Sequence, residues 1–248
     1  MANDPLDAFT FLALCNCLGG LTEGQFINRF FQIHRSTYGA RHTVKPEMLD
    51  TIRQLLGNNA IRRTQDDVGL QLPPIFLTTA TVDGDDAKIV EMLKAHPGLD
   101  RAITKALEQG GLSFLDAQYV ATLRRLIGEA KAVPYGEMLL DELHSGKDKQ
   151  VVYGFHKEAL LTLAEYLTQH GIRCSVINGD TNDKARNAYV KSFQETSEHR
   201  VFIANIRAAG VGVTLTRSPY IDMLESDWSP AGNAQAIKRI HRIGQRQT

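Results

Sequence analysis

Three polar side chains near the C-terminus are spaced so that they could act together on a phosphate. Gln235, Arg239 and Arg242 stand at positions i, i+4 and i+7, which on one continuous helix lie within about 40° of one another. Ser229 and Pro230 predict the start of that helix, because serine caps exposed amides and proline suits the first helical position. Guanidinium groups bind phosphate oxygens bidentately, and phosphoryl-transfer enzymes use them to stabilise charge on the transferred group.

The alternative for this helix is an ordinary amphipathic element with a solvated basic face. Its apolar residues gather on the opposite side, and Gly244 is the expected stop. These apolar residues are Ala236, Ile237, Ile240 and Ile243. The helix alone does not decide between the two interpretations. A phosphate site would also require other segments of the chain to place suitable residues beside this helix.

Composition is typical of a soluble globular protein. Of 248 residues, 43% are hydrophobic and 23% are charged, and 28 Lys and Arg balance 28 Asp and Glu. Net charge therefore gives no indication of a nucleic-acid partner, and a local basic patch would have to supply any DNA contact. Three cysteines are too few for a disulfide scaffold, and no apolar segment is long enough to span a membrane. We expect an intracellular protein with no membrane association.

The first half of the chain has a helical pattern with little chemistry. Helices are expected over 23–34, 47–56, 85–95 and 99–108, with a short strand over 75–81. A helix is then predicted to end before Pro134, and a further helix to run from there to Leu143. The basic residues Arg124, Arg125 and Lys131 of this region are expected to be solvated.

From Gln150 onward the pattern changes to alternating strands and helices. Strands are predicted over 151–155, 172–177, 201–204 and 220–224, and helices over 158–170 and 182–193 before the closing helix. This order and these lengths predict an α/β fold, a parallel sheet covered by helices on both faces. Ligands of such sheets bind at the carboxyl ends of the strands.

Each of these strands is followed by residues suited to a phosphate-rich ligand. His156-Lys157 begins a helix whose free amides attract phosphate. The turn Asn178-Gly179-Asp180-Thr181 has polar side chains that can cap the next helix. Small residues in the loop 205–216 allow close backbone approach to a ligand, and the loop 227–230 holds the chain's only tryptophan. Each feature alone is also common in proteins without such a function.

Taken in order, these segments resemble the second RecA-like lobe of a Swi/Snf-type DNA-dependent ATPase of superfamily two. The closing run Gln-Ala-x-x-Arg-x-His-Arg-Ile-Gly-Gln is similar to the last helicase motif of that family, and Asp-Trp-Ser-Pro at 227–230 is similar to its Asp-Trp-Asn-Pro. The loop 205–216 resembles the family's Thr-Arg-Ala-Gly-Gly-Leu-Gly-Ile-Asn-Leu-Thr, and the turn at 178–181 stands where the family has Asp-Gly-Ser-Thr. Residues 61–74 resemble the segment with which the family leaves its first lobe.

The chain also departs from the family pattern. Ile206 replaces a threonine that contacts DNA in the family, and Ala209 replaces a glycine. With Thr214 in place of asparagine, the loop is more similar to the branch that contains the annealing helicases. A side-chain contact with DNA at position 206 is therefore not expected.

The resemblance implies roles for individual residues. Arg239 and Arg242 would act as arginine fingers on the γ-phosphate of ATP bound by the first lobe, Gln235 would face the same nucleotide, and Gly210 and Gly212 would lie at the lobe interface. The residues implied to line the DNA backbone are His156, Lys157, Gly179, Asp180, Thr181, Asn205 and Arg207. Such contacts read phosphates, so binding is expected to be independent of sequence and sensitive to salt.

Two motifs of such an ATPase do not occur in the sequence: the Gly-x-x-x-x-Gly-Lys-[Ser/Thr] loop that cradles phosphates and the acidic motif that holds magnesium. We therefore interpret residues 1–74 as the helical tail of a first lobe with its linker, 75–147 as a helical insertion, and 148–248 as a RecA-like lobe truncated at its end. ATP and Mg²⁺ would be bound mainly by the missing first lobe. The chain alone is expected to be inactive and to hold no metal.

The leading hypothesis is the C-terminal half of an ATP-dependent DNA translocase, a remodelling enzyme or annealing helicase. Its expected partners are double-stranded DNA and the N-terminal ATPase lobe of the same protein. The alternatives are an RNA helicase lobe, or a degenerate module for nucleic-acid binding or scaffolding without ATPase activity. The expected location is the cytoplasm, in association with the nucleoid in a bacterium or phage, or the nucleus in a eukaryote.

Overall fold

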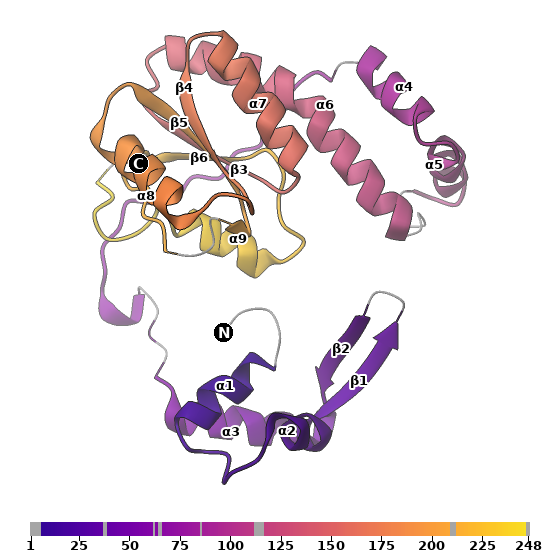
Figure 1. Ribbon diagram of the computed structural model, residues 1–248, viewed down its shortest axis with the longest axis vertical. Coiled ribbons are helices and arrows are strands. Elements are labelled where there is room, and N and C mark those ends of the chain that lie inside the picture. Colours follow the sequence, from indigo (N-terminus) through magenta and orange to yellow (C-terminus); the bar gives the residue numbers. More distant parts are fainter. Residues whose placement is uncertain are drawn as a thin grey trace. The chain divides into compact units, whose positions relative to one another are not determined.

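A computed structural model describes residues 6–36, 39–61, 63, 66–84, 86–111, 117–208 and 212–246. The chain divides into two compact units, Met1–Gln71 and Leu72–Thr248 (Figure 1). None of the helices within the described ranges is both long and apolar enough to cross a lipid bilayer.

The first unit packs helices against a two-stranded hairpin. Its elements are α1 (Asp7–Leu14), α2 (Glu23–Phe30), β1 (Phe31–Ser36), β2 (Gly39–Val44), η1 (Pro46–Met48), α3 (Leu49–Asn59) and η2 (Asp66–Val68). The helix expected over 23–34 is wrong beyond Phe30, because Phe31 adopts an extended backbone and pairs with Val44. Phe26, Phe30 and Phe31 belong to one core cluster. Phe31 is buried in the strand, and a helix with the same apolar spacing also predicts a buried residue at this position, so the spacing did not reveal the hairpin.

The second unit begins with an irregular segment and two short helices. The strand expected over 75–81 is wrong, because residues 70–84 form no regular structure. Ile75, Phe76 and Leu77 are exposed, and a β-rich sequence forms a strand only where a partner strand is available. The helices expected next are confirmed as α4 (Asp86–Lys94) and α5 (Leu99–Glu108).

A single long helix, α6 (Ala117–His144), follows. The predicted break at Pro134 is wrong, because the helix continues through this residue. A proline inside a helix removes one backbone hydrogen bond, but the residues behind it gain burial: Tyr135, Leu139 and Leu143 pack into the same core cluster as the sheet. This packing stabilises the helix across the proline, so the C-terminal half of α6 is part of the sheet's core.

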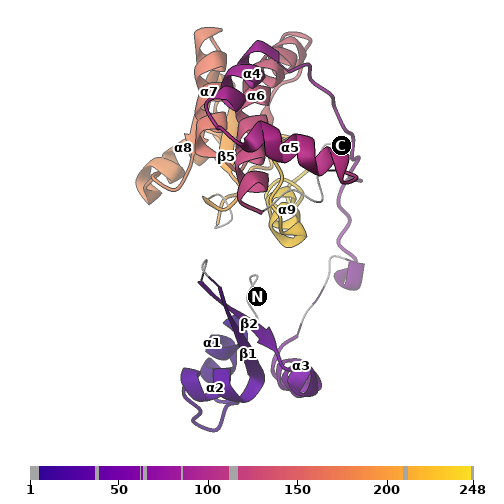
Figure 2. The same cartoon turned by 90° about the vertical axis from the view of Figure 1, so that its right-hand side faces the viewer.

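The sheet has four parallel strands in the order β4-β5-β3-β6. They are β3 (Gln150–Gly154), β4 (Arg173–Ile177), β5 (His199–Asn205) and β6 (Tyr220–Met223). Helices α6 and α7 (Lys157–Gln169) cover one face and α8 (Asp183–Glu195) and α9 (Pro230–Ile237) the other (Figures 1 and 2). Neighbouring residues such as Val151 and Val152 belong to different core clusters, as alternation along a strand requires. The predicted α/β class with helices on both faces is confirmed.

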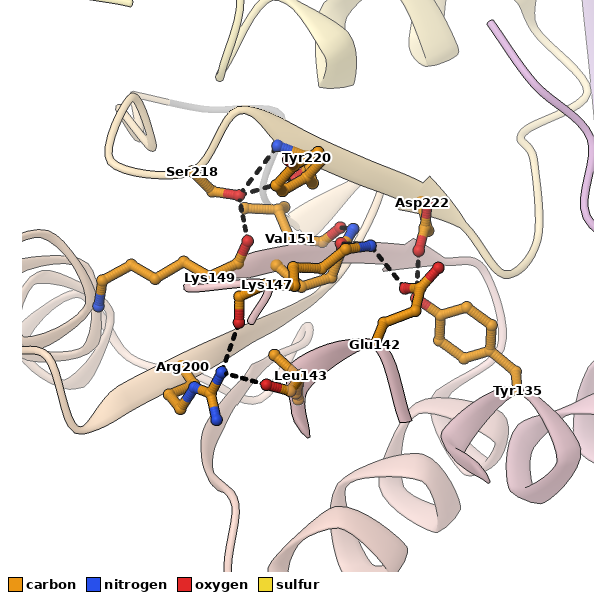
Figure 3. A network of polar contacts seen from close by, with 11 residues as sticks. Tyr135, Glu142, Leu143, Lys147, Lys149, Val151, Arg200, Ser218, Tyr220 and Asp222 are labelled. Atoms are coloured by element: carbon orange, nitrogen blue, oxygen red, sulfur yellow. Dashed lines mark hydrogen bonds and ion pairs between the residues drawn. The ribbon is translucent and has the colours of Figure 1, made fainter. Parts of the chain in front are cut away.

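A polar network fixes the end of α6 to the sheet (Figure 3). The Tyr135 hydroxyl donates to Asp222 Oδ2 at 2.7 Å. The Arg200 guanidinium donates to the carbonyl oxygen of Leu143 at 2.9 Å and to that of Lys147. Burial raises the pKa of the Asp222 carboxyl, and burial together with Asp222 raises that of Tyr135. These bonds tie α6 to β5 and β6 and thereby hold the sheet on which the loops stand.

A buried histidine is expected to make this unit sensitive to acid. His199 is 2% exposed, and neither ring nitrogen has a hydrogen-bond partner in the part of the chain that the structure describes. Burial, together with the positive charges of Lys149 and Arg173, lowers the pKa of His199 from 6.5 to about 4. Between these two pH values the unfolded chain takes up a proton that the folded unit excludes, so stability falls as pH falls.

We expect the free energy of unfolding to decrease between pH 6.5 and pH 4 by at most about 3 kcal/mol from this group, at about 1.4 kcal/mol per pKa unit. Urea unfolding at pH 7 and at pH 4.5 measures the difference. His199→Gln cannot take up the proton and is expected to show a smaller pH dependence. An equal pH dependence in both proteins would exclude His199 as its source.

Candidate functional site

The carboxyl ends of the strands bring several predicted DNA-facing residues to one edge of the sheet. His156 follows β3 and is the N-cap residue of α7, which starts at Lys157. Asp180 lies in the loop after β4, and the Lys157 ammonium contacts its carboxylate. The Lys157 and Asp180 side chains are 51% and 74% exposed, so their ion pair is weak and can exchange for a phosphate contact.

Asn205, the last residue of β5, and Arg207, just after that strand, join this edge between the ends of β3 and β4. The Asn205 amide donates to the carbonyl oxygen of Phe155 at 2.5 Å, and its Oδ1 accepts the Arg207 N–H at 2.9 Å. The Arg207 guanidinium lies 4.9 Å from the Phe155 ring centroid and 3.4 Å from Asp227 Oδ2. Burial opposes ionisation of Asp227, but the Ser229 N–H and Arg207 outweigh it and hold the pKa of that carboxyl below its usual range.

The turn after β4 is built by its own side chains. Asn178 Oδ1 accepts the Asp180 N–H at 2.9 Å, and Thr181 Oγ1 accepts the Asn178 N–H at 3.0 Å. The expectation that these residues cap the next helix is wrong, because Asn182 caps α8 by accepting the Ala185 N–H. A side chain at Gly179 would meet nothing within 4 Å. The turn therefore does not require a glycine at this position for steric reasons.

A buried glutamate that the sequence did not single out fixes the loop after β3. Glu225 is 5% exposed. Its Oε2 accepts the N–H groups of Phe155 at 3.0 Å and His156 at 2.9 Å, and its Oε1 lies 2.6 Å from His156 Nδ1. The His156 amide, which was expected to be free for a phosphate, is therefore already used, whereas α7 has no side-chain cap. Among the described residues, no side chain accepts a hydrogen bond from the amide of Lys157, the first residue of α7.

Three basic residues of α6 are not simply solvated, contrary to expectation. The Lys131 ammonium donates to the carbonyl oxygen of Leu224 at 2.7 Å, and burial lowers the pKa of Lys131. The Arg124 guanidinium lies 4.5 Å from the ring centroid of Trp228. Arg125 pairs with Glu129 at 2.6 Å. Lys131 and Arg124 thus connect α6 to the loop after β6. The expectation of solvated side chains rested on residue type alone and did not predict these contacts.

The predicted nucleotide-facing residues do not share one helical face. Ser229 caps α9 and Pro230 is its first residue, as predicted, but α9 ends at Ile237 instead of continuing to Ile243. After Ile237 the chain is hydrogen-bonded to the 212–216 segment, because the carbonyl oxygen of Arg239 accepts the Leu215 N–H at 2.9 Å.

The two arginines are instead placed individually. Arg242 Nη1 donates to Thr214 Oγ1 at 3.0 Å, Arg239 is partly buried, and Gln235 is exposed on α9. Gly212 has a φ of +76°, a conformation that favours glycine. Gly210 lies outside the described residues.

Comparison with known proteins concerns mainly the second unit. Residues 135–244 match the family model described as "Helicase conserved C-terminal domain". A chromatin-remodeling ATPase INO80 of Aspergillus oryzae is 31% identical over 126 residues, which are 51% of this chain and 9% of that protein. The INO80 of Vanderwaltozyma polyspora is 24% identical over 244 residues, 98% of this chain and 15% of that protein. The chain thus spans a small part of the relatives that it matches.

Among solved structures, a crystal structure of the C-terminal part of the Fun30 ATPase domain is similar. Its TM-score is 0.45 with 20% sequence identity, and the alignment covers 49% of this chain and 39% of that chain.

Proposed function

We propose that the chain supplies the second lobe of an ATP-dependent DNA translocase that remodels chromatin or reanneals strands, and the match of residues 135–244 to the helicase C-terminal domain model supports this. Lys157, Asp180 and Arg207 gather at the carboxyl edge of the sheet, and this observation carries the proposal. Parallel sheets bind ligands at that edge. The similarity to remodelling ATPases favours DNA as the ligand.

The DNA contact is proposed to be made to phosphates. The N-cap residue of α7 makes no side-chain cap, so the amides from Lys157 onward and the positive end of the helix dipole can face a phosphate, and the exposed Lys157 ammonium lies beside them. Arg207 is 69% exposed and can present guanidinium N–H groups to a phosphate while it keeps its contact with Asp227. The turn at 178–181, with Gly179 and Thr181, completes the proposed backbone track. These groups carry no base readout, so binding is independent of sequence.

The nucleotide is proposed to be bound mainly by a first lobe, together with Mg²⁺. In this chain Arg239 and Arg242 would act on the γ-phosphate of that ATP, with Gln235 facing the nucleotide and with Gly210 and Gly212 at the lobe interface. The segment 1–74 would belong to the first lobe and its linker, and 75–147 would be an insertion. A eukaryotic member would act in the nucleus.

The test is ATP turnover in a protein that joins this chain to an ATP-binding first lobe, measured with duplex DNA, duplex RNA or no nucleic acid. We expect stimulation by duplex DNA. Stimulation by RNA alone would support an RNA helicase lobe instead, and nucleic-acid binding without turnover would support a scaffolding module.

A further inference from the structure

A single arginine of α6 stands between two aromatic rings of the site. The guanidinium carbon of Arg124 lies 4.9 Å from the ring centroid of Phe155 and 4.5 Å from that of Trp228. Phe155 precedes α7, and Trp228 precedes α9. Arg207 contacts the same Phe155 ring at 4.9 Å. The four side chains therefore form a continuous stack across the loops after β3, β5 and β6.

The stack is held by ring contacts instead of hydrogen bonds at its centre. Arg124 Nη1 is buried, and among the described residues it has no hydrogen-bond partner. Leaving a guanidinium N–H without a partner is unfavourable. Contact of the cation with the faces of two rings offsets this cost, because arginine stacks on aromatic rings and is weakly hydrated. Arg124 is thus held in place by the rings, and it holds the rings in turn.

Trp228 lies largely open to solvent apart from this contact with Arg124. Trp228 as a residue is 65% exposed and borders a cavity of about 310 Å³ between α6 and the loop after β6. Arg124, Gly128 and Lys131, at i, i+4 and i+7, form one face of α6 that lines this cavity. Lys131 holds the backbone of Leu224, and Gly128 leaves room for the Glu225 carboxylate. One face of α6 therefore contacts the loop after β3, through Phe155, and the loop after β6, through Trp228 and Leu224.

We propose that Arg124 is a positioning residue for DNA binding. It fixes Phe155 and Trp228, and through them it holds the loops after β3 and β6 in the conformation that receives the DNA backbone. Arg124 lies ahead of the segment that matches the helicase domain, so this places part of the DNA-binding machinery in the helical region before it. The inference rests on the proposed function, because it assumes that this edge binds duplex DNA.

The test uses the 248-residue chain and its only tryptophan. The affinity for a labelled DNA duplex is measured by anisotropy, and the accessibility of Trp228 by acrylamide quenching. The variants are Arg124→Ala and Arg124→Lys. Arg125→Ala is the matched control, because it removes the same charge from the neighbouring residue, which pairs with Glu129 and His96.

Arg124→Ala is expected to weaken DNA binding about tenfold, the effect of losing two partly desolvated cation–π contacts, and to increase quenching of Trp228. Arg124→Lys is expected to recover part of both losses. Arg125→Ala is expected to stay within about twofold of the wild type, because the partners of Arg125 are Glu129 and His96 and its ion pair is partly exposed. A circular dichroism melt checks that each variant is folded.

The alternative outcomes are distinguishable. If the wild type binds DNA and Arg124→Ala binds as well as Arg125→Ala, the positioning role is wrong and the proposed function stands. If Arg124→Ala weakens binding but leaves Trp228 quenching unchanged, Arg124 contacts DNA directly and the positioning role is again wrong. If the wild type itself does not bind duplex DNA, the proposed DNA edge is wrong and the inference is overturned with it.

Discussion

Arg242→Ala and Arg239→Ala are each expected to lower DNA-stimulated ATP turnover about a thousandfold in a protein that joins this chain to an ATP-binding lobe. An arginine that reaches the γ-phosphate stabilises charge that develops only in the transition state, so its loss lowers kcat more than it changes KM. Steady-state turnover at saturating ATP and DNA measures the effect.

The structure sharpens this prediction for Arg242. Because α9 ends at Ile237, helical geometry does not aim the Arg242 side chain, and its bond to Thr214 Oγ1 does. Thr214→Val is therefore expected to lower turnover about tenfold, as for a lost orienting hydrogen bond to a charged group. Lys238→Ala, an exposed cation in the same segment, is the charge control and should be close to the wild type. Near-normal turnover of Arg239→Ala or Arg242→Ala would contradict the arginine-finger assignment.

Glu225→Ala is expected to destabilise the second unit by about 3–5 kcal/mol, the usual effect of breaking a buried charged contact. The substitution leaves the N–H groups of Phe155 and His156 without their acceptor and removes the partner of His156 Nδ1. Urea unfolding followed by Trp228 fluorescence reports on this unit alone. Glu165→Ala, at an exposed position of α7, should change the stability by less than about 0.5 kcal/mol.

Gly128→Ala tests the same contact from the side of α6. A Cβ at this position would lie 2.3 Å from Glu225 Oε1, so the carboxylate would have to move. Alanine is intrinsically the better helix former, so a loss of stability here, expected to be about 1–3 kcal/mol, can come only from overpacking. An unchanged or increased stability would show that Glu225 is not held against α6. In the experiment with Glu225→Ala, a loss of stability as small as that of Glu165→Ala would contradict the proposal that the Glu225 carboxylate holds the loop after β3.

The sequence predicted the sheet well because its strands and helices have strong local signals. The strands around Val152 and Ile203 are short, apolar and buried, and the helices between them have regular apolar faces. The order of strands and helices also predicted that the loops after the strands lie together at the carboxyl edge of the sheet. Their assignment to DNA followed from the family resemblance and stays a prediction.

What sequence patterns missed depends on contacts between distant residues. Glu225 follows an apolar strand, which was the available signal, but its partners lie about 70 residues away along the chain. Arg124 lies in a helix whose own sequence gives no reason to expect two aromatic partners. The end of α9 at Ile237 is set by hydrogen bonds to the 212–216 segment, while the apolar pattern continues as for a helix.

The affinity of the 248-residue chain for duplex DNA as a function of salt tests the central claim most directly. We expect binding that is independent of sequence. The logarithm of the association constant is expected to fall linearly with the logarithm of the salt concentration, and the steepness of this fall is expected to be about one smaller in Lys157→Ala and in Arg207→Ala. Asp180→Asn, which releases Lys157 from its ion pair, is expected to raise the affinity, and Lys191→Ala on α8 is the control. Absence of binding, or a slope that is the same in Lys157→Ala and Arg207→Ala as in the wild type, would contradict the proposal that this edge of the sheet receives DNA.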